Sequence, residues 1–365
     1  MTEEKKITNY CSMPVVSERE FGVHVNPYRR SLIRILGKKW VNGTVLHYYF
    51  FDKETDGAYV DLTDGSREWR TWTTSEEEKN VVRNAFSKWK DIGIGLEFKE
   101  VATRDEAEVR IGFMRGDGAW SYLGRDIIDL NLGKDERTMN FGWDLTHDED
   151  TAMHEIGHTL GFPHEHQNPK AGIVWNEQAV YTELASPPNY WSPEKTYYNI
   201  IRKIDSDTIQ GSKWDPNSIM HYPFGPGLII SPEQYKNGIY PKPGLSEHDK
   251  EWVRKFYPPL DDNDLEELPP FASSKLMLNP GEQKNFIIKP SETRKYNIAT
   301  FGKSDSVIIL LEKNDNGELY IAGDDDSGED YNASMNLKLY RGKKYILRVR
   351  LYYRQRAGET AVMYW

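Results

Sequence analysis

One stretch of the sequence combines residue types that bind a metal ion with a residue that can move a proton. Residues 154–164 follow the pattern H-E-x-x-H-x-x-G-x-x-H. Residues four apart on a helix lie on one face, so His154 and His158 can bind the same ion. Gly161 tolerates a positive φ, which lets the helix end and the chain turn back to bring in His164. Three neutral imidazoles with an open fourth position are the ligand set of a catalytic zinc site.

Glu155 directly follows the first of these histidines. Its carboxylate can reach a water molecule on the zinc, which lowers the pKa of that water so that Glu155 can take its proton. The same residues could simply be ordinary helix residues. The added glycine and third histidine make the pattern specific, and the sequence therefore predicts zinc-dependent hydrolysis.

Composition restricts the class of protein around this motif. The chain has 365 residues, a formal net charge of -10 and one cysteine, Cys11. The negative charge argues against nucleic acid as a partner. No apolar run is long enough to span a bilayer. The polar start shows no leader, as in a cytosolic protein or a secreted chain given without its leader. A single cysteine cannot form an intramolecular disulfide.

The elements that must position the motif can be predicted from periodicity and capping. An aromatic and β-branched run predicts a strand at 44–51, and Asp, Thr and Gly in 52–73 predict a hairpin or loop. Thr74 and Ser75 before three glutamates predict the start of a helix. We expect helices at 75–92 and 148–160, strands at 96–101 and 109–113, and shorter extended pieces at 119–124, 129–132 and 138–141.

The rest of the chain falls into three parts. Residues 165–217 have weak periodicity, with short helices expected at 177–184 and 193–198, and an amphipathic helix follows at 246–257. The acidic, proline-ended stretch 260–270 predicts a linker. Beyond it, short alternating runs predict a small antiparallel β-sandwich. These runs are 285–288, 307–311, 318–321, 337–340, 345–350 and 361–364.

A second motif, Ser218-Ile219-Met220-His221-Tyr222, lies downstream of the zinc motif. Together the two motifs resemble those of the astacin-like metzincin metalloproteases, of a bacterial type, over about residues 38–257. The resemblance implies an α+β fold. Its catalytic domain would have a twisted mixed sheet, two long helices and an irregular C-terminal subdomain, followed here by the β-sandwich.

The resemblance also implies roles for single residues. Met220 would lie beneath the metal as a hydrophobic base, although an ordinary core Met would pack in the same way. Tyr222 would be a fifth zinc ligand that swings away to stabilise the oxyanion, or else a buried structural Tyr. Glu165 would contact the new N-terminus after propeptide removal, or else be a solvated Glu. The upper-rim strand would pair with substrate backbone through residues Ala119, Trp120, Ser121 and Tyr122.

Cys11 gains a meaning from this resemblance. Astacins usually hold two disulfides in the catalytic domain, and this chain can form none. A thiolate is a strong zinc ligand, so Cys11 could block the fourth position from a propeptide-like segment, residues 1–30. The alternatives are a disordered tail and an incidental thiol. Arg29-Arg30 is a pair that a trypsin-like activating protease could cut.

The C-terminal region resembles a bacterial pre-peptidase C-terminal domain. Its acidic run, Asp324 to Asp330, could bind calcium, because hard oxygen ligands suit that ion, or could be a solvated loop.

The sequence therefore predicts a propeptide-like segment (1–30), a catalytic domain (31–259), a linker (260–270) and a β-sandwich domain (271–365). The predicted function is a secreted, monomeric zinc endopeptidase acting on proteins or peptides. The alternative is a non-catalytic binding protein that uses the β-sandwich on a vestigial protease fold.

Overall fold

The computed structural model divides the chain into two compact units, Met1–Pro259 and Leu260–Trp365. It describes residues 9–16, 38–40, 42–62, 64–204, 213–259, 265–279, 281–314, 317–352 and 356–365. The predicted cleavage pair Arg29-Arg30 lies outside these residues. Among the described residues, no helix is long and apolar enough to cross a membrane.

The first unit contains a five-stranded mixed sheet in the order β4-β1-β5-β7-β6. Strands β1, β4, β5 and β7 pair in parallel, and β6 pairs antiparallel with β7 at the edge. The strands are β1 (Val45–Phe50), β4 (Glu97–Glu100), β5 (Val109–Gly112), β6 (Trp120–Ser121) and β7 (Met139–Asn140). A separate hairpin, β2 (Gly57–Asp61) and β3 (Arg67–Thr71), follows β1. The strands predicted at 44–51, 96–101, 109–113, 119–124 and 138–141 and the hairpin after the first of them are confirmed.

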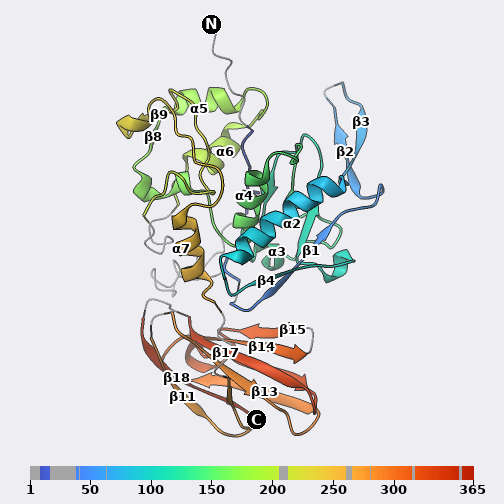
Figure 1. The fold of residues 1–365 in the computed structure, drawn as a ribbon, viewed down its shortest axis with the longest axis vertical. Helices are drawn as coiled ribbons and strands as arrows, with labels where there is room; N and C mark the ends of the chain where they lie inside the picture. The colour runs from blue at the N-terminus through green and yellow to red at the C-terminus, as the bar shows by residue number, and fades with distance from the viewer. Residues whose placement is uncertain are drawn as a thin grey trace. The chain divides into compact units, whose positions relative to one another are not determined.

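Helices α2 (Glu76–Asp91) and α4 (Glu149–Thr159) run next to each other (Figure 1). Helix α2 begins where expected, because the Ser75 side chain accepts a hydrogen bond from the Glu78 N–H. Its apolar face buries Val82, Phe86 and Trp89. These side chains join residues of β1, β5 and α4 in one hydrophobic core. The core places α4 firmly beside the sheet.

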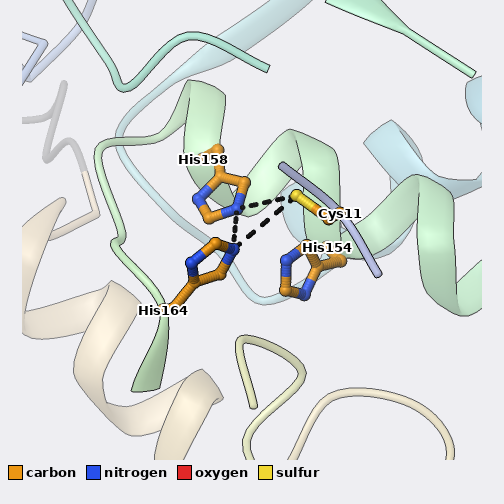
Figure 2. Close-up of side chains that lie close together, drawn as sticks. All are labelled: Cys11, His154, His158 and His164. Carbon is orange, nitrogen blue, oxygen red and sulfur yellow. Dashed lines mark hydrogen bonds between the residues drawn. The ribbon is translucent and has the colours of Figure 1, made fainter. Parts of the chain in front are cut away.

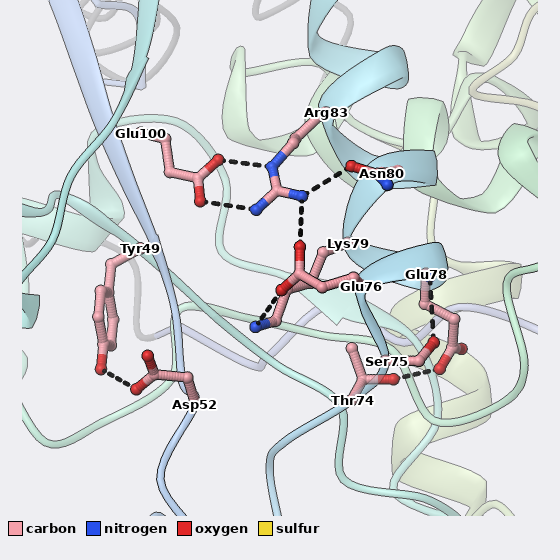
Figure 3. Close-up of polar contacts among 10 residues, drawn as sticks. All are labelled: Tyr49, Asp52, Thr74, Ser75, Glu76, Glu78, Lys79, Asn80, Arg83 and Glu100. Carbon is pink, nitrogen blue, oxygen red and sulfur yellow. Dashed lines mark hydrogen bonds and ion pairs between the residues drawn. The ribbon is translucent and has the colours of Figure 1, made fainter.

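Polar contacts fix α2 over the edge strand β4 (Figure 3). Arg83 on α2 makes two hydrogen bonds to the Glu100 carboxylate, of 2.7 and 2.8 Å. The same guanidinium reaches Glu76 and Asn80 on its own helix, at 2.9 and 2.7 Å. Half-exposed ion pairs contribute little stability, but this two-pronged contact defines how the helix lies along the strand.

The part of the first unit that follows α4 is mostly short elements, as the weak periodicity predicted. It also holds a short strand pair, β8 with β9, that the sequence did not predict. In the following list, η marks a short 3-10 helix, except that η4 is a single turn of π-helix. The elements are η2 (Glu165–Gln167), η3 (Pro169–Ala171), β8 (Val174–Trp175), α5 (Glu177–Leu184), α6 (Pro193–Thr196), η4 (Tyr197–Ile201), β9 (Ile229–Ser231), η6 (Glu233–Tyr235) and α7 (Glu247–Phe256).

The second unit is built of two sheets in the orders β10-β12-β17-β14-β15 and β11-β18-β13-β16. Buried side chains from both sheets form one hydrophobic cluster. All pairings are antiparallel except β10 with β12. The strands are β10 (Glu266–Glu267), β11 (Ser274–Leu278), β12 (Gln283–Ile288), β13 (Arg294–Phe301), β14 (Ser306–Asn314), β15 (Gly317–Asp324), β16 (Ser334–Leu339), β17 (Lys344–Leu351) and β18 (Gly358–Tyr364).

Two local features of the structure differ from the sequence predictions. The extended piece predicted at 129–132 is wrong, because the chain there leaves a one-turn helix, α3 (Asp126–Asp129). Buried Ile127 and the ion pair of Asp126 with Lys38 hold that turn in place. Strands β11 and β13 were not predicted. In the stretch expected to be a linker, the described residues 265–270 contain β10 and a buried Leu268, and the linker itself stays a prediction.

Candidate metal centre

Helix α4 carries the first two histidines and is buried along most of its length. The helix starts at Asp148, whose side chain accepts a hydrogen bond from the Thr151 N–H. His154 and His158 lie one turn apart with ring centroids separated by 4.7 Å. Both rings are buried, as is the Glu155 side chain between them in sequence. The two imidazoles therefore lie together on one helix face, and their role as metal ligands stays a prediction.

The turn after α4 brings the third histidine back to the same place. Gly161 has φ +92°, a conformation that residues with a Cβ rarely adopt. The chain reverses there, and the Phe162 N–H donates to the Gly157 carbonyl. The His164 ring then lies 4.6 Å from the His158 ring and 5.4 Å from the His154 ring. The sequence prediction for Gly161 is therefore correct in its physical reason as well.

Backbone carbonyls orient two of the three rings. His154 Nδ1–H donates to the Ile219 carbonyl and His158 Nδ1–H donates to the Phe162 carbonyl, each at 2.7 Å. These bonds leave the Nε2 atoms as the free lone pairs, which is the arrangement that metal-binding histidines use. The Nε2 atoms of His158 and His164 lie 3.1 Å apart.

Cys11 completes the group from the N-terminal segment (Figure 2). Its Sγ lies 3.5 Å from His158 Nε2 and 3.6 Å from His164 Nε2. The four potential ligand atoms of Cys11, His154, His158 and His164 all lie within 4.8 Å of one another. Within the described residues, this is the one group of three or more His, Cys, Asp or Glu side chains arranged to hold an ion.

The donors suit a metal ion in charge and in unmet hydrogen-bonding capacity. Burial lowers the pKa of His154 to about 4 and lowers the pKa values of His158 and His164 well below the ordinary value. The imidazoles are therefore neutral, the form that binds metal. Among the described residues, none is a hydrogen-bond partner for the buried His154 Nε2. Three nitrogens and one sulfur in a compact group match the tetrahedral preference of zinc.

Glu155 is fully buried beside these donors. Burial raises the pKa of Glu155 to about 8, and the neighbouring Cys11 side chain opposes this shift. A carboxyl group can both accept and donate a proton, as general acid–base catalysis needs.

Tyr222 also reaches the centre. Its hydroxyl donates to the Cys11 carbonyl at 2.6 Å and lies within hydrogen-bonding distance of His164 Nε2. Its ring centroid is 4.4 Å from that of His164 and 5.5 Å from that of His154. The structure thus brings together the predicted catalytic pair and the predicted ligands.

The turn around Met220 is held under the histidines by a residue that the sequence analysis missed. Asp249 accepts hydrogen bonds from Ser218 Oγ (2.6 Å) and from the Ile219 N–H (2.8 Å). Asp249 also forms a capping box with Ser246 at the start of α7. The S-x-x-D spacing was a signal for that box. Nothing local showed that the same carboxylate also anchors the turn whose Ile219 carbonyl orients His154.

The predicted rim residues lie at the sheet edge with different exposures. The Ala119 carbonyl accepts a hydrogen bond of 3.0 Å from the Ser12 N–H of the N-terminal segment. Trp120 is half-buried, whereas Ser121 is buried and its hydroxyl contacts Thr159 Oγ1 at 3.0 Å. Tyr122 packs on the core. A backbone-pairing edge is therefore present, and the N-terminal segment already makes one bond to it.

Glu165 directly follows His164 in the chain and accepts hydrogen bonds from two neighbouring residues. Its carboxylate accepts hydrogen bonds from the Asp215 N–H (3.0 Å) and from Asn168 Nδ2 (3.2 Å). Burial raises the pKa of Glu165 to about 7. Its predicted contact with a new N-terminus stays a prediction.

The acidic run of the second unit does not form a comparable cluster. Asp324 accepts hydrogen bonds from the Ser327 N–H, from Ser327 Oγ and from the Ser334 N–H. Asp324 therefore serves a turn, and its neighbours among the described residues are not gathered around one point. The structure does not support the calcium site.

Comparisons with known proteins point to one family. Residues 69–242 match the model of the astacin peptidase family. The chain is 26% identical over 154 residues to "Blastula protease 10" of Paracentrotus lividus, covering 41% of this chain and 23% of that protein. It is 30% identical over 145 residues to "Metalloendoproteinase 1-MMP" of Arabidopsis thaliana, covering 34% and 39%. The chain thus spans less than half the length of these curated relatives.

Among solved structures, the chain resembles myroilysin at 28% identity, with a TM-score of 0.51 over 61% of this chain and 97% of that one. The pre-peptidase C-terminal domain of a Bacillus anthracis collagenase matches 29% of this chain and 99% of that one. Its identity is 14% and its TM-score 0.25. That likeness is too weak to carry an argument, so the kinship expected for the C-terminal region stays a prediction.

Proposed function

Residues 69–242 form a metalloendopeptidase domain of the astacin family, and from this premise we propose that the chain is a zinc-dependent endopeptidase held latent by Cys11. The observation that carries the proposal is the meeting of three neutral imidazoles and one thiol within 4.8 Å, with the buried Glu155 carboxyl next to that thiol. His154, His158 and His164 would hold the ion. Zinc supplies a Lewis acid that polarises a carbonyl and lowers the pKa of water.

The protein's own residues supply the proton transfer and the charge stabilisation. Glu155 takes a proton from the attacking water and passes it to the leaving amine, and its burial keeps it from titrating like a surface glutamate. The Tyr222 hydroxyl, which donates to a carbonyl oxygen of the bound segment, would donate in the same way to the oxyanion of a substrate. The edge beyond β6 would pair with substrate backbone, as the Ala119 carbonyl does with Ser12.

Latency in this proposal comes from the N-terminal segment. The Cys11 sulfur lies next to the histidines, where a substrate would approach. The Cys11 carbonyl accepts the hydrogen bond that the Tyr222 hydroxyl would otherwise donate to a substrate. We assign residues 1–30 as the segment that an activating protease removes and 31–259 as the catalytic domain. Residues 260–270 would connect it to a β-sandwich domain at 271–365, and the connection contributes the short strand β10 to that domain's sheet. Secretion and a monomeric state belong to the same proposal.

The catalytic role of Glu155 predicts the result of Glu155→Gln. Gln keeps the volume but cannot carry the proton, so casein hydrolysis by the activated enzyme should fall by about 10²- to 10⁴-fold. Zinc content, measured by atomic absorption, should stay at the level of the parent because the three histidines are unchanged. The control is Glu149→Gln, at the partly buried start of the same helix, where Glu149 pairs with Lys88. Retained hydrolysis in Glu155→Gln would rule out this mechanism.

The latency of the full chain predicts the result of Cys11→Ala. Without the thiol one of the contacts that close the site is lost, so the uncleaved chain should hydrolyse casein at least about tenfold faster than the parent. A chelator should abolish the gained activity. Val15→Ala, an exposed change in the same segment, is the control. If uncleaved Cys11→Ala stays as inactive as the parent, the thiol is not what holds the enzyme latent.

A further inference from the structure

The residue before Cys11 is held as firmly as the cysteine itself. Tyr10 is buried, and its ring stacks on Phe224 with centroids 5.8 Å apart. The edges of Tyr222 (5.3 Å) and Trp191 (6.3 Å) close two further sides. These surroundings belong to a hydrophobic cluster of the region after α4, separate from the core under the sheet. One side chain of the N-terminal segment therefore fills a site built by the catalytic unit.

The backbone around Tyr10 is bound as an extended peptide would be. The Tyr10 N–H donates to Asn189 Oδ1 at 3.1 Å, and the Cys11 carbonyl accepts from the Tyr222 hydroxyl. The Ser12 N–H then donates to the Ala119 carbonyl at the sheet edge. Three consecutive residues thus bond to three separate parts of the unit. Such alternation of backbone bonds and an inserted side chain is how peptides bind at a sheet edge.

We propose that the site around Tyr10, formed by Trp191, Tyr222 and Phe224, is the substrate subsite that selects an aromatic side chain next to the scissile bond. The inference rests on the proposed endopeptidase function and names its substrate class. Cys11 faces the histidines, so the residue next to it in the chain sits one position from the reacting centre. A substrate peptide that replaces the segment would present one of its own side chains to the same walls.

The chemistry of the walls favours an aromatic ring over other side chains. Aromatic pairs at these separations gain from edge-to-face and stacked geometry in addition to burial. A small side chain would leave most of the space empty, and an empty space among buried aromatic rings is costly. Burial, followed by the negative charge of Glu183, raises the pKa of Tyr10. The same surroundings would therefore disfavour an acidic side chain.

A first test uses the full-length chain and needs no proteolysis. Cys11 is the only cysteine, so its rate of reaction with a thiol reagent reports how often the segment leaves its site. Tyr10→Ala should raise that rate by about tenfold or more, because the buried ring is lost. Tyr10→Phe should stay within about twofold of the parent, since the ring remains. Val15→Ala is the exposed control. An unchanged rate in Tyr10→Ala would overturn the proposal.

A second test starts from the full-length chain, activates it by proteolysis and determines which bonds it cleaves in a library of peptides from denatured proteins. We expect Tyr, Phe and Trp to be enriched at one fixed position flanking the cleaved bond. Trp191→Ala should reduce that enrichment through KM for aromatic substrates, and Trp191→Phe should restore it. If no peptide is cleaved, both the proposed function and this subsite are ruled out. If peptides are cleaved without an aromatic preference, only the subsite is ruled out.

Discussion

Gly157 lies between the first two histidines, at a position where there is no room for a side chain. A Cβ added there would lie 2.3 Å from Met220 Sδ and 3.4 Å from the Trp89 ring. The absence of a side chain at this position lets the methionine pack directly against α4 beneath the histidines. The glycine and the downstream turn are therefore complementary parts of one contact.

This complementarity predicts that Gly157→Ala destabilises the protein. Alanine favours a helix by about 1 kcal/mol over glycine, but overpacking a filled core costs about 1–3 kcal/mol and displaces Met220. We expect a lower free energy of unfolding in urea. The added cost should shrink in a Met220→Ala background, where the sulfur is gone. Gly225→Ala is the control, because nothing lies near its Cβ position. Equal costs in both backgrounds would contradict the contact.

At the residue scale, the sequence predicted what depends on local spacing. His154, Glu155 and His158 follow from the helical repeat, and His164 follows from the positive φ available to Gly161. Tyr10 and Asp249 could not be predicted in the same way. Tyr10 meets Trp191 and Phe224 across long stretches of chain, and Asp249 reaches Ser218 from another helix. Such contacts exist only once the fold is formed.

The elements are stabilised at their ends as well as along their faces, and α2 shows this most clearly. Glu78 in its first turn is buried and accepts the Leu145 N–H at 2.9 Å, besides contacts from Arg115 and Thr74. Burial alone would raise the pKa of Glu78, but the hydrogen bonds from Arg115, Thr74 and Leu145 outweigh it and lower that pKa. Figure 3 shows Glu78 beside Thr74 and the capping Ser75.

A lowered pKa in the folded state gives stability that is present above the unfolded-state pKa, about 4.5, and is lost as the pH falls through the folded-state value. We therefore expect Glu78→Gln to lower the free energy of unfolding by about 1–3 kcal/mol at neutral pH. The difference from the parent should shrink below about pH 4.5. Urea titrations across this pH range measure it. Glu77→Gln, at an exposed position of the same turn, is the control. A pH-independent loss in Glu78→Gln would contradict the argument.

At the scale of elements, capped helices and apolar strands were predictable and weakly patterned strands were not. Helix α2 has a cap, acidic residues in its first turn and a continuous apolar face. Strand β11 instead mixes Lys275 and Met277 on its exposed side with buried leucines, and it pairs with β18 from far along the chain. Its pairing partner, and not its own sequence, defines it as a strand.

The whole molecule consists of two units, each with its own hydrophobic cluster. The metal-binding group lies entirely in the first unit. A ligand that binds only the folded state stabilises that state by mass action, and here only one of the two units would gain. Metal occupancy and the stability of the second unit should therefore be independent.

This independence predicts two thermal transitions that respond differently to a chelator. Removing zinc should lower the midpoint of one transition, with a loss of about 4 kcal/mol if zinc was present at a thousandfold excess over its Kd. The other transition should be unchanged and should match that of residues 260–365 expressed alone. Differential scanning calorimetry with and without the chelator measures both. A shift of both transitions, or a single merged one, would count against separate units.

The contacts that the catalytic unit makes with three consecutive residues of the N-terminal segment affect the kinetics of activation. Cutting the chain beyond the segment breaks a covalent tether but none of the bonds made by Tyr10, Cys11 and Ser12. The fragment then changes from an intramolecular ligand at high effective concentration to a free peptide that competes with substrate. Full activity should therefore lag behind cleavage in a concentrated solution and appear promptly on dilution. The concentration of the released fragment, as well as the activating protease, therefore determines when the enzyme becomes active.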